Sequence, residues 1–99
     1  MGRLNPDERY KQLLGSAVEV AKTSGFNEMT HTLVALHAKV SKATVFKYFE
    51  TIFKLREEVM KIALTQELLP IIAAGVVARN ETALSASDDL KEKALASIL

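Results

Sequence analysis

Cysteine is absent from the 99-residue sequence, which excludes disulfides and thiolate chemistry and is consistent with the reducing cytoplasm in which we expect the protein to work. The N-terminal stretch MGRLNPDERYK lacks the apolar core of a signal peptide. The longest apolar run, residues 68–78, has 11 residues. Because that length is too short to cross a bilayer, we expect no membrane partner.

Groups that catalysis or metal binding would need are also scarce. The sequence contains no Gly-rich phosphate loop and no nucleophilic cysteine. His31 and His37 are six positions apart, so a continuous helix would turn them away from each other, unlike a zinc pair. The paired carboxylates at positions 57–58 and 88–89 would point apart on a helix. We therefore expect no enzyme activity, no metal site and no cofactor.

Charge of either sign is nearly balanced, at a net +1, but it is unevenly spread. Residues 1–61 contain ten Lys or Arg and seven Asp or Glu, a balance of +3, whereas residues 62–99 contain three and five, a balance of −2. Residues 31–56 contain five cationic residues and one acidic residue, a balance of +4. This local excess favours an anionic partner at one face, although a solvated face of ordinary lysines would have the same composition.

Helical spacing of apolar residues dominates the sequence and predicts an all-α fold. Apolar residues make up 48% of the chain and charged residues 25%, which is typical of a globular protein. Asn5, Pro6 and Glu8 have the pattern of an N-cap, a first helical position and a capping box. Apolar residues then recur at helical spacing as far as Gly25, which predicts a left-handed helix end.

Residues 34–49, VALHAKVSKATVFKYF, predict two short helices joined by a tight turn. Thr30 is expected to N-cap a helix that runs to about His37, and Ser41 is expected to N-cap a second helix that ends near Phe49. Two short helices with a turn of three to four residues match the helix-turn-helix unit.

A helix that enters the major groove of DNA needs a polar outer face with donors near its N-terminus, and the segment from Ser41 to Lys47 has one. Val45 and Phe49 are four residues apart and are expected to pack inward. The helix N-terminus adds free N–H groups and a positive dipole end. For Phe46, core packing and contact with a thymine methyl group stay open as alternatives. From the residues alone, the candidate contacts are Lys42, Thr44, Lys47 and Tyr48, with His31 and Thr32 at the start of the preceding helix.

These stretches resemble the N-terminal domain of the tetracycline-repressor (TetR-like) family of transcriptional regulators, a homeodomain-like helical domain. The family typically has a threonine pair, an Ile-Ala, an Ala-Gly-Val-Ser and a Gly-Thr-Leu-Tyr-x-His-Phe. The matching stretches are Met29-Thr30, Val34-Ala35, Ala38-Lys39-Val40-Ser41 and Ala43-Thr44-Val45-Phe46-Lys47-Tyr48-Phe49. The resemblance covers roughly residues 9–59 and implies double-stranded DNA as the partner. It implies contacts from Thr30, His31, Thr32, Lys42, Ala43, Thr44, Phe46, Lys47 and Tyr48.

Three positions depart from that family pattern. Lys39 replaces the turn glycine, so the turn must tolerate a side chain or take another conformation. Ala43 replaces a common glycine. Ile52 stands where the family often has a phosphate-binding lysine, and either Lys54 substitutes for it or that contact is lost. With Ser41 and Lys54 added, the predicted DNA-binding site is complete.

The sequence predicts a helix-turn-helix domain at residues 1–55 and a short helical dimerisation segment at residues 56–99. A fourth helix is expected from Thr51 to about Leu69, where Pro70 would kink or end it. Residues 80–87 are expected to form a turn-rich connection before a last helix that begins at Ser87. Members of the family usually carry a long effector-binding domain, and about 40 residues leave little room for a ligand pocket, which makes a small-molecule effector doubtful.

Apolar residues in this second segment exceed what one short chain is expected to bury, which predicts a homodimer. The expected interface residues are Leu64, Leu68, Leu69, Ile71, Ile72, Val76 and Val77. Alternatively, these residues cover the core of their own chain. The predicted function is a sequence-specific regulator of transcription, most simply a repressor that binds a palindromic operator as a dimer. The alternative function is a protein-interaction module that binds another protein through its apolar C-terminal surface.

Overall fold

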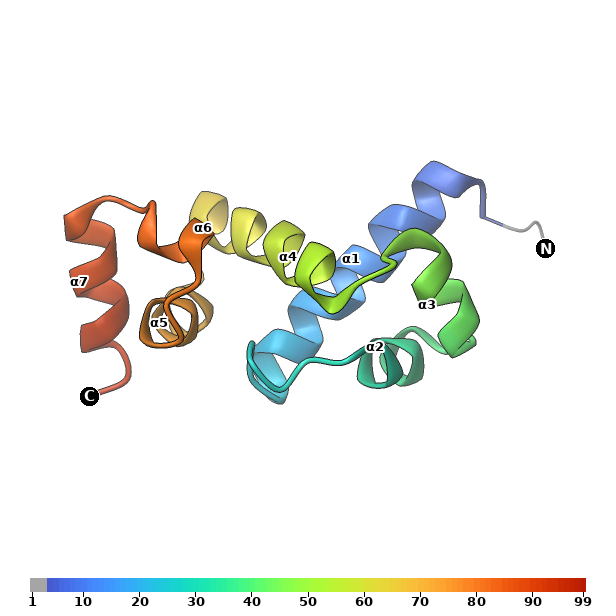
Figure 1. Ribbon diagram of the computed structural model, residues 1–99, viewed down its shortest axis with the longest axis horizontal. Helices are drawn as coiled ribbons and strands as arrows, with labels where there is room; N and C mark the ends of the chain where they lie inside the picture. The colour runs from blue at the N-terminus through green and yellow to red at the C-terminus, as the bar shows by residue number, and fades with distance from the viewer. Residues whose placement is uncertain (1–3) are drawn as a thin grey trace.

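The structure, a computed structural model, describes residues 4–99, which form seven α-helices and no strand (Figure 1). The prediction of an all-α fold is therefore confirmed. The helices are α1 (Pro6–Thr23), α2 (His31–Ala38), α3 (Lys42–Tyr48), α4 (Ile52–Gln66), α5 (Leu69–Val77), α6 (Glu81–Leu84) and α7 (Asp88–Ala96). None of the helices in this described part is both long enough and apolar enough to span a membrane.

The molecule is elongated, with principal extents of 45 × 21 × 20 Å. Figure 1 shows α2 and α3 toward one end, α5, α6 and α7 at the other end, and α4 running between the two groups. α1 packs against both α2 and α4. The helix-turn-helix unit is therefore supported from one side and stands at an extremity of the molecule.

Side-chain caps set the helix starts that the sequence predicts. In the capping box, the Glu8 N–H donates to Asn5 Oδ1 at 2.8 Å and the Asn5 N–H donates to Glu8 Oε1 at 3.1 Å. The residues at the other predicted helix starts each accept a hydrogen bond from the backbone N–H three residues on, and these are Thr30, Ser41, Thr51 and Ser87. At the end of α1, Gly25 has a φ of +104°, the left-handed conformation that the sequence predicts. These boundaries follow from local hydrogen bonds, because the first N–H groups of a helix have no partner within it.

One apolar core joins the first four helices. Val45 of α3 and Phe49, which follows α3, are 0% and 2% exposed, so both face inward as predicted. Leu13 of α1, Val34 of α2 and Leu55 of α4 belong to the same core. The burial of Val45 and Phe49 leaves the polar side of α3 on the surface.

The junction of α4 and α5 differs from the prediction. α4 ends at Gln66, earlier than predicted, because Glu67 takes the left-handed conformation with a φ of 52°. The Leu68 N–H then donates to the Ala63 carbonyl at 2.9 Å. Pro70 lies in the first turn of α5, where a helix needs no N–H donor, so this proline begins a helix and does not end one.

The segment predicted as a turn-rich connection contains one helical turn, α6. Asn80 caps it, and its Oδ1 accepts a hydrogen bond from the Ala83 N–H at 3.0 Å. α6 packs against both α4 and α5, so this connection is part of the fold.

Burial divides the residues that were predicted to form a dimer interface. Ile71 and Ile72 are 2% and 0% exposed within their own chain. Because α5 packs on α4, α6 and α7, the burial of these two residues favours the alternative that they cover the core of their own chain. Four others are half-buried against the core, namely Leu64, Leu68, Leu69 and Val76. Val77 is 66% exposed.

Gly75 permits a close approach of α5 to its neighbours. A Cβ at this position would lie 2.4 Å from Met60 Cε of α4 and 2.7 Å from Ala83 Cβ of α6. Contacts that short require the neighbours to move, so α5 can take this position only with glycine at residue 75.

The predicted division between residues 1–55 and 56–99 falls inside α4, which runs without interruption from Ile52 to Gln66. Leu55, Val59 and Met60 of this helix are fully buried. The division remains a prediction, and any boundary there would cut a helix that contributes to the core on both sides of it.

Candidate nucleic-acid interface

The turn between α2 and α3 takes the conformation of a glycine turn although lysine occupies it. Lys39 has φ 59° and ψ 45°, in the left-handed region. The Val40 N–H donates to the Ala35 carbonyl at 3.1 Å, and Gln12 Nε2 of α1 donates to the Ala38 carbonyl at 3.3 Å. The turn thus tolerates a side chain, at the energetic cost that the left-handed region imposes on a residue with a Cβ.

Two hydroxyl groups in the predicted site cap helices. Thr30 Oγ1 accepts from the Leu33 N–H at 3.1 Å, and Ser41 Oγ accepts from the Thr44 N–H at 3.1 Å. The Ser41 and Thr44 hydroxyls also lie 2.9 Å apart in a mutual hydrogen bond. These contacts fix the starts of α2 and α3, and they orient the Thr44 hydroxyl toward its own helix.

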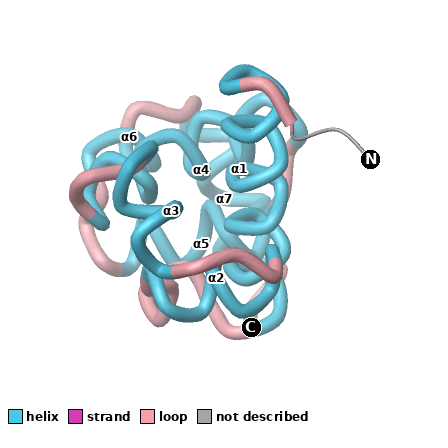
Figure 2. Tube along the Cα trace, turned by 90° about the vertical axis from the view of Figure 1, so that its right-hand side faces the viewer, coloured by secondary structure: helices cyan, strands magenta, loops and turns pink. Residues whose placement is uncertain are grey.

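Figure 2 views the molecule from the end at which α3 lies, and four lysines lie on or near this helix in the chain. Lys39, Lys42, Lys47 and Lys54 are all exposed. None of these four forms an ion pair within residues 4–99. Because no carboxylate in that part of the chain lies within ion-pair distance of them, their ammonium groups are available to an anionic partner such as a phosphate backbone.

The outer face of α3 is otherwise small or apolar. Ala43 is exposed and leaves room for close approach to a base edge, and Thr32 is exposed on the first turn of α2. Phe46 is 40% exposed, which places it between the two alternatives of core packing and surface contact. Thr30 and Ser41 of the predicted site are exposed as well.

His31, another predicted contact, lies mostly inside the helix-turn-helix unit. It is only 8% exposed, and its Nε2–H donates to the Phe49 carbonyl at 2.7 Å. Its ring lies parallel to that of Phe46, with centroids 3.9 Å apart and an angle of 7° between the planes. The imidazole therefore packs inside the unit, where a phosphate cannot reach the nitrogen that is already bonded.

Tyr48 and Lys54 meet at a recess below α3. The recess has a volume of about 360 Å³ and is lined by Tyr10, Tyr48, Phe49, Lys54, Glu57 and Glu58. Tyr48 is half-buried and Lys54 is exposed on the first turn of α4. The structure thus brings Lys54 close to α3, as a substitute for the absent lysine at position 52 would require.

Comparison with known proteins identifies the unit that has this geometry. Residues 13–59 match the family described as bacterial regulatory proteins, tetR family. This part of the chain is a TetR-family domain. The resemblance seen in the sequence is therefore confirmed.

One curated relative extends the match beyond the TetR-family domain. The chain is similar to the HTH-type transcriptional regulator LuxR of Vibrio harveyi, with 41% identity over 64 residues, which are 65% of this chain and 31% of that protein. The match thus spans about a third of the length of that relative, at 31%. No solved structure matches the chain.

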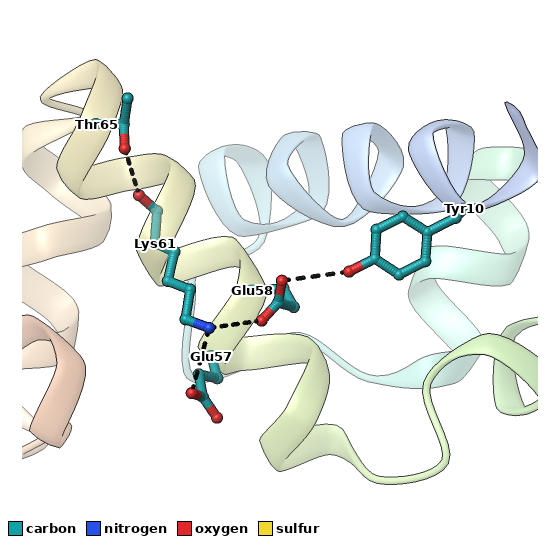
Figure 3. Close-up of polar contacts among 5 residues, drawn as sticks. All are labelled: Tyr10, Glu57, Glu58, Lys61 and Thr65. Carbon is teal, nitrogen blue, oxygen red and sulfur yellow. Dashed lines mark hydrogen bonds and ion pairs between the residues drawn. The ribbon is translucent and has the colours of Figure 1, made fainter. Parts of the chain in front are cut away.

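A polar network that the sequence did not predict ties α1 to α4 (Figure 3). The Tyr10 hydroxyl donates to Glu58 Oε1 at 3.2 Å, and Lys61 Nζ contacts Glu58 at 3.1 Å and Glu57 at 3.5 Å. Burial, together with the charge of Glu58, raises the pKa of Tyr10, so the phenol stays a donor. The hydrogen bond to Glu58 raises the pKa of Lys61. Lys61 thus partly neutralises two carboxylates that would otherwise add negative charge on this side of the domain.

A second unpredicted contact set braces the loop that leads into α2 of the TetR-family domain. Arg56 Nη2 donates to the Asn27 carbonyl at 3.2 Å and approaches the Met29 carbonyl at 3.5 Å. Asn27 Nδ2 in turn donates to the Ala74 carbonyl of α5 at 3.2 Å. The sequence analysis counted Arg56 only as part of a cationic cluster. Its partners Asn27 and Met29 lie 29 and 27 positions earlier in the chain, so no local pattern predicts these contacts.

Proposed function

We propose that this chain binds double-stranded DNA in a sequence-specific manner and regulates transcription, with α3 in the major groove. The observation that carries the proposal is the group of exposed lysines around α3, which have no ion-pair partner within residues 4–99. Such a face suits the phosphates on both sides of a groove. The family of residues 13–59 supports the same activity.

Within this proposal the residues divide by role. Lys42, Lys47 and Lys54 contact phosphates or a guanine edge, because each is an exposed cation on α3 or at the start of α4. Tyr48 contacts the backbone from the rim of the recess. Ala43 allows α3 to approach the bases closely. His31 acts through its packing and makes no direct contact.

We further propose that the working form is a homodimer that represses by occluding a promoter. Two helix-turn-helix units would read a palindromic operator whose half-sites are about one helical turn apart or somewhat more. The interface proposed here keeps the residues that retain free surface, namely Leu64, Leu68, Leu69, Val76 and Val77. We propose the cytoplasm as the compartment in which the protein binds its DNA.

The first experiment measures binding to a random DNA duplex across a salt series, with the molar mass determined by light scattering. We expect salt-sensitive binding by a dimer, with a log–log slope of roughly −0.9 for each phosphate contact. Lys42→Ala should weaken binding at every salt concentration and make the log–log slope less steep by roughly 0.9, the contribution of one phosphate contact.

The matched control for that variant is Lys93→Ala. Lys93 is an exposed lysine of α7, at the opposite end of the molecule (Figure 1). It should leave both the affinity and the slope unchanged. Equal effects of the two variants, or binding that does not respond to salt, would contradict the proposed docking of α3.

A protein-interaction module is the second candidate function. Exposed apolar side chains of the C-terminal helices favour it, with Val77 66% and Ile98 52% exposed. An apolar protein interface does not weaken steeply as salt rises, whereas binding to phosphates does. The same salt series therefore separates the two functions.

A further inference from the structure

Phe46 combines features that neither a core residue nor an ordinary surface residue has. Its ring is 40% exposed on α3, between the exposed residues Lys42, Ala43 and Lys47. An apolar ring at such a polar face loses hydrophobic stabilisation relative to a buried one. The ring is nevertheless held in one position by its neighbours.

His31 stacks on the Phe46 ring. Its ring lies flat against the Phe46 ring, with centroids 3.9 Å apart and planes within 7°. The imidazole is itself fixed, because its Nε2–H donates to the Phe49 carbonyl at 2.7 Å and only 8% of the residue is exposed. A carbonyl oxygen can only accept, so this bond also fixes which nitrogen bears the proton.

Further contacts support the His31–Phe46 pair from the core and from the surface. Inward, Phe49 is 2% exposed and its ring centroid lies 5.1 Å from that of Tyr10 of α1. Outward, Lys42 Nζ lies over the Phe46 ring, 5.7 Å from its centroid. Phe46 is therefore supported from the core and orders very little further when it meets a partner, which lowers the entropic cost of contact.

We propose that Phe46 reads the C5-methyl group of a thymine in the major groove and that His31 is the positioning residue that holds its ring for this contact. The inference rests on the proposed function and names the base chemistry that α3 recognises. A phenyl ring has no hydrogen-bond donor or acceptor, and the thymine methyl is the apolar group that the base pairs present in the major groove. His31 already covers one face of the Phe46 ring. The surface of the ring that remains free therefore suits contact with a methyl group better than insertion between two stacked bases.

The test compares thymine with uracil, which lacks only that methyl group. Duplexes bound by the full-length chain are enriched from a random library, and the enriched duplex is remade with deoxyuridine in place of each thymidine in turn. We expect a loss of about fourfold in affinity at one position in each half-site, as for one buried methyl group. The substitution lies in the DNA, so the result does not depend on the folding of a variant.

Two phenylalanine variants complete the test. Phe46→Ala should bind the thymine and uracil duplexes equally and more weakly than the wild type binds the thymine duplex. The matched control is Phe53→Ala, because Phe53 is a second exposed phenylalanine, at 75%, on α4. This control should keep the fourfold preference for thymine.

The role of His31 needs a readout that a loss of stability would not imitate. In His31→Gln the amide can still donate to the Phe49 carbonyl but offers no ring to Phe46. We expect the preference for thymine to fall toward one while the salt slope keeps its wild-type value. An unchanged preference in this variant would overturn the positioning role.

The remaining outcomes are also decisive. If uracil has no effect at any position while Phe46→Ala weakens all duplexes alike, the ring contacts sugar or packs within the protein, and the inference is wrong. If no sequence is enriched and binding does not respond to salt, the proposed function fails and the inference fails with it.

Discussion

At the end that holds the helix-turn-helix unit, α1, α2 and α3 each begin with a polar side chain that caps the helix, whereas α5, at the opposite end, begins after Leu68 with no side-chain cap. The surfaces differ in the same way. One end exposes Lys39, Lys42 and Lys47, and the other exposes Val77 and Ile98. α6 and α7 at the second end are also capped by side chains, so the contrast lies in α5, whose place depends on close packing of residues far apart in the chain. The comparison shows which substitutions each end should tolerate.

The largest effect is expected from a charge in the core of the end that holds the helix-turn-helix unit. Val45 is 0% exposed, so Val45→Asp would bury a carboxylate without a partner and should destabilise the protein by roughly 3–5 kcal/mol. Unfolding by urea, followed by circular dichroism, measures the change. Leu36→Asp is the control, because Leu36 is 70% exposed on α2, and it should cost less than about 0.5 kcal/mol. Similar unfolding midpoints for the two variants would refute the assignment of Val45 to the core.

The two helix glycines give a direct comparison of the ends. Gly75→Ala in α5 would bring a Cβ to 2.7 Å from Ala83 Cβ and should destabilise by about 1–3 kcal/mol. Gly15→Ala in α1 meets nothing within 4 Å and should stabilise by about 0.5–1 kcal/mol, because alanine favours the helix. Urea unfolding of both variants checks the opposite signs. A stabilising Gly75→Ala would mean that α5 packs less closely than the structure shows.

The smallest effect is expected at the turn between α2 and α3. Lys39→Gly removes a Cβ from a residue with a φ of 59° and should stabilise the protein by about 1 kcal/mol. Lys39→Ala removes the same charge and keeps the strain, so it should leave stability nearly unchanged. The difference between the two unfolding free energies isolates the backbone term. Equal values for glycine and alanine would show that the turn is not strained.

The sequence predicted those parts of the fold that short-range interactions determine. Thr30, Ser41 and Ser87 each cap a helix through a bond to a residue three positions away, so the pattern and the contact lie in the same short stretch. The inward positions of Val45 and Phe49 follow from helical periodicity. The family pattern then pointed to the correct domain, which no single residue identifies.

The sequence was least informative about contacts between distant parts of the chain. Pro70 was expected to end a helix, but Glu67 had already ended α4, and a proline is equally compatible with a first turn. Ile71 and Ile72 are buried by α4, α6 and α7, and hydrophobicity alone does not distinguish a core from an interface. His31 was expected at a phosphate, but the carbonyl that binds it lies 18 residues away.

The brace between Asn27 and α5 has a consequence for anyone who wishes to graft this recognition unit onto another protein. The loop before α2 is held by Arg56 of α4 and, through Asn27, by the Ala74 carbonyl of α5. A fragment cut at residue 55 would lose Arg56 and most of α4, and one cut at residue 66 would still lose Ala74. The smallest transplantable piece that keeps every support of the loop therefore extends to the end of α5, at Val77.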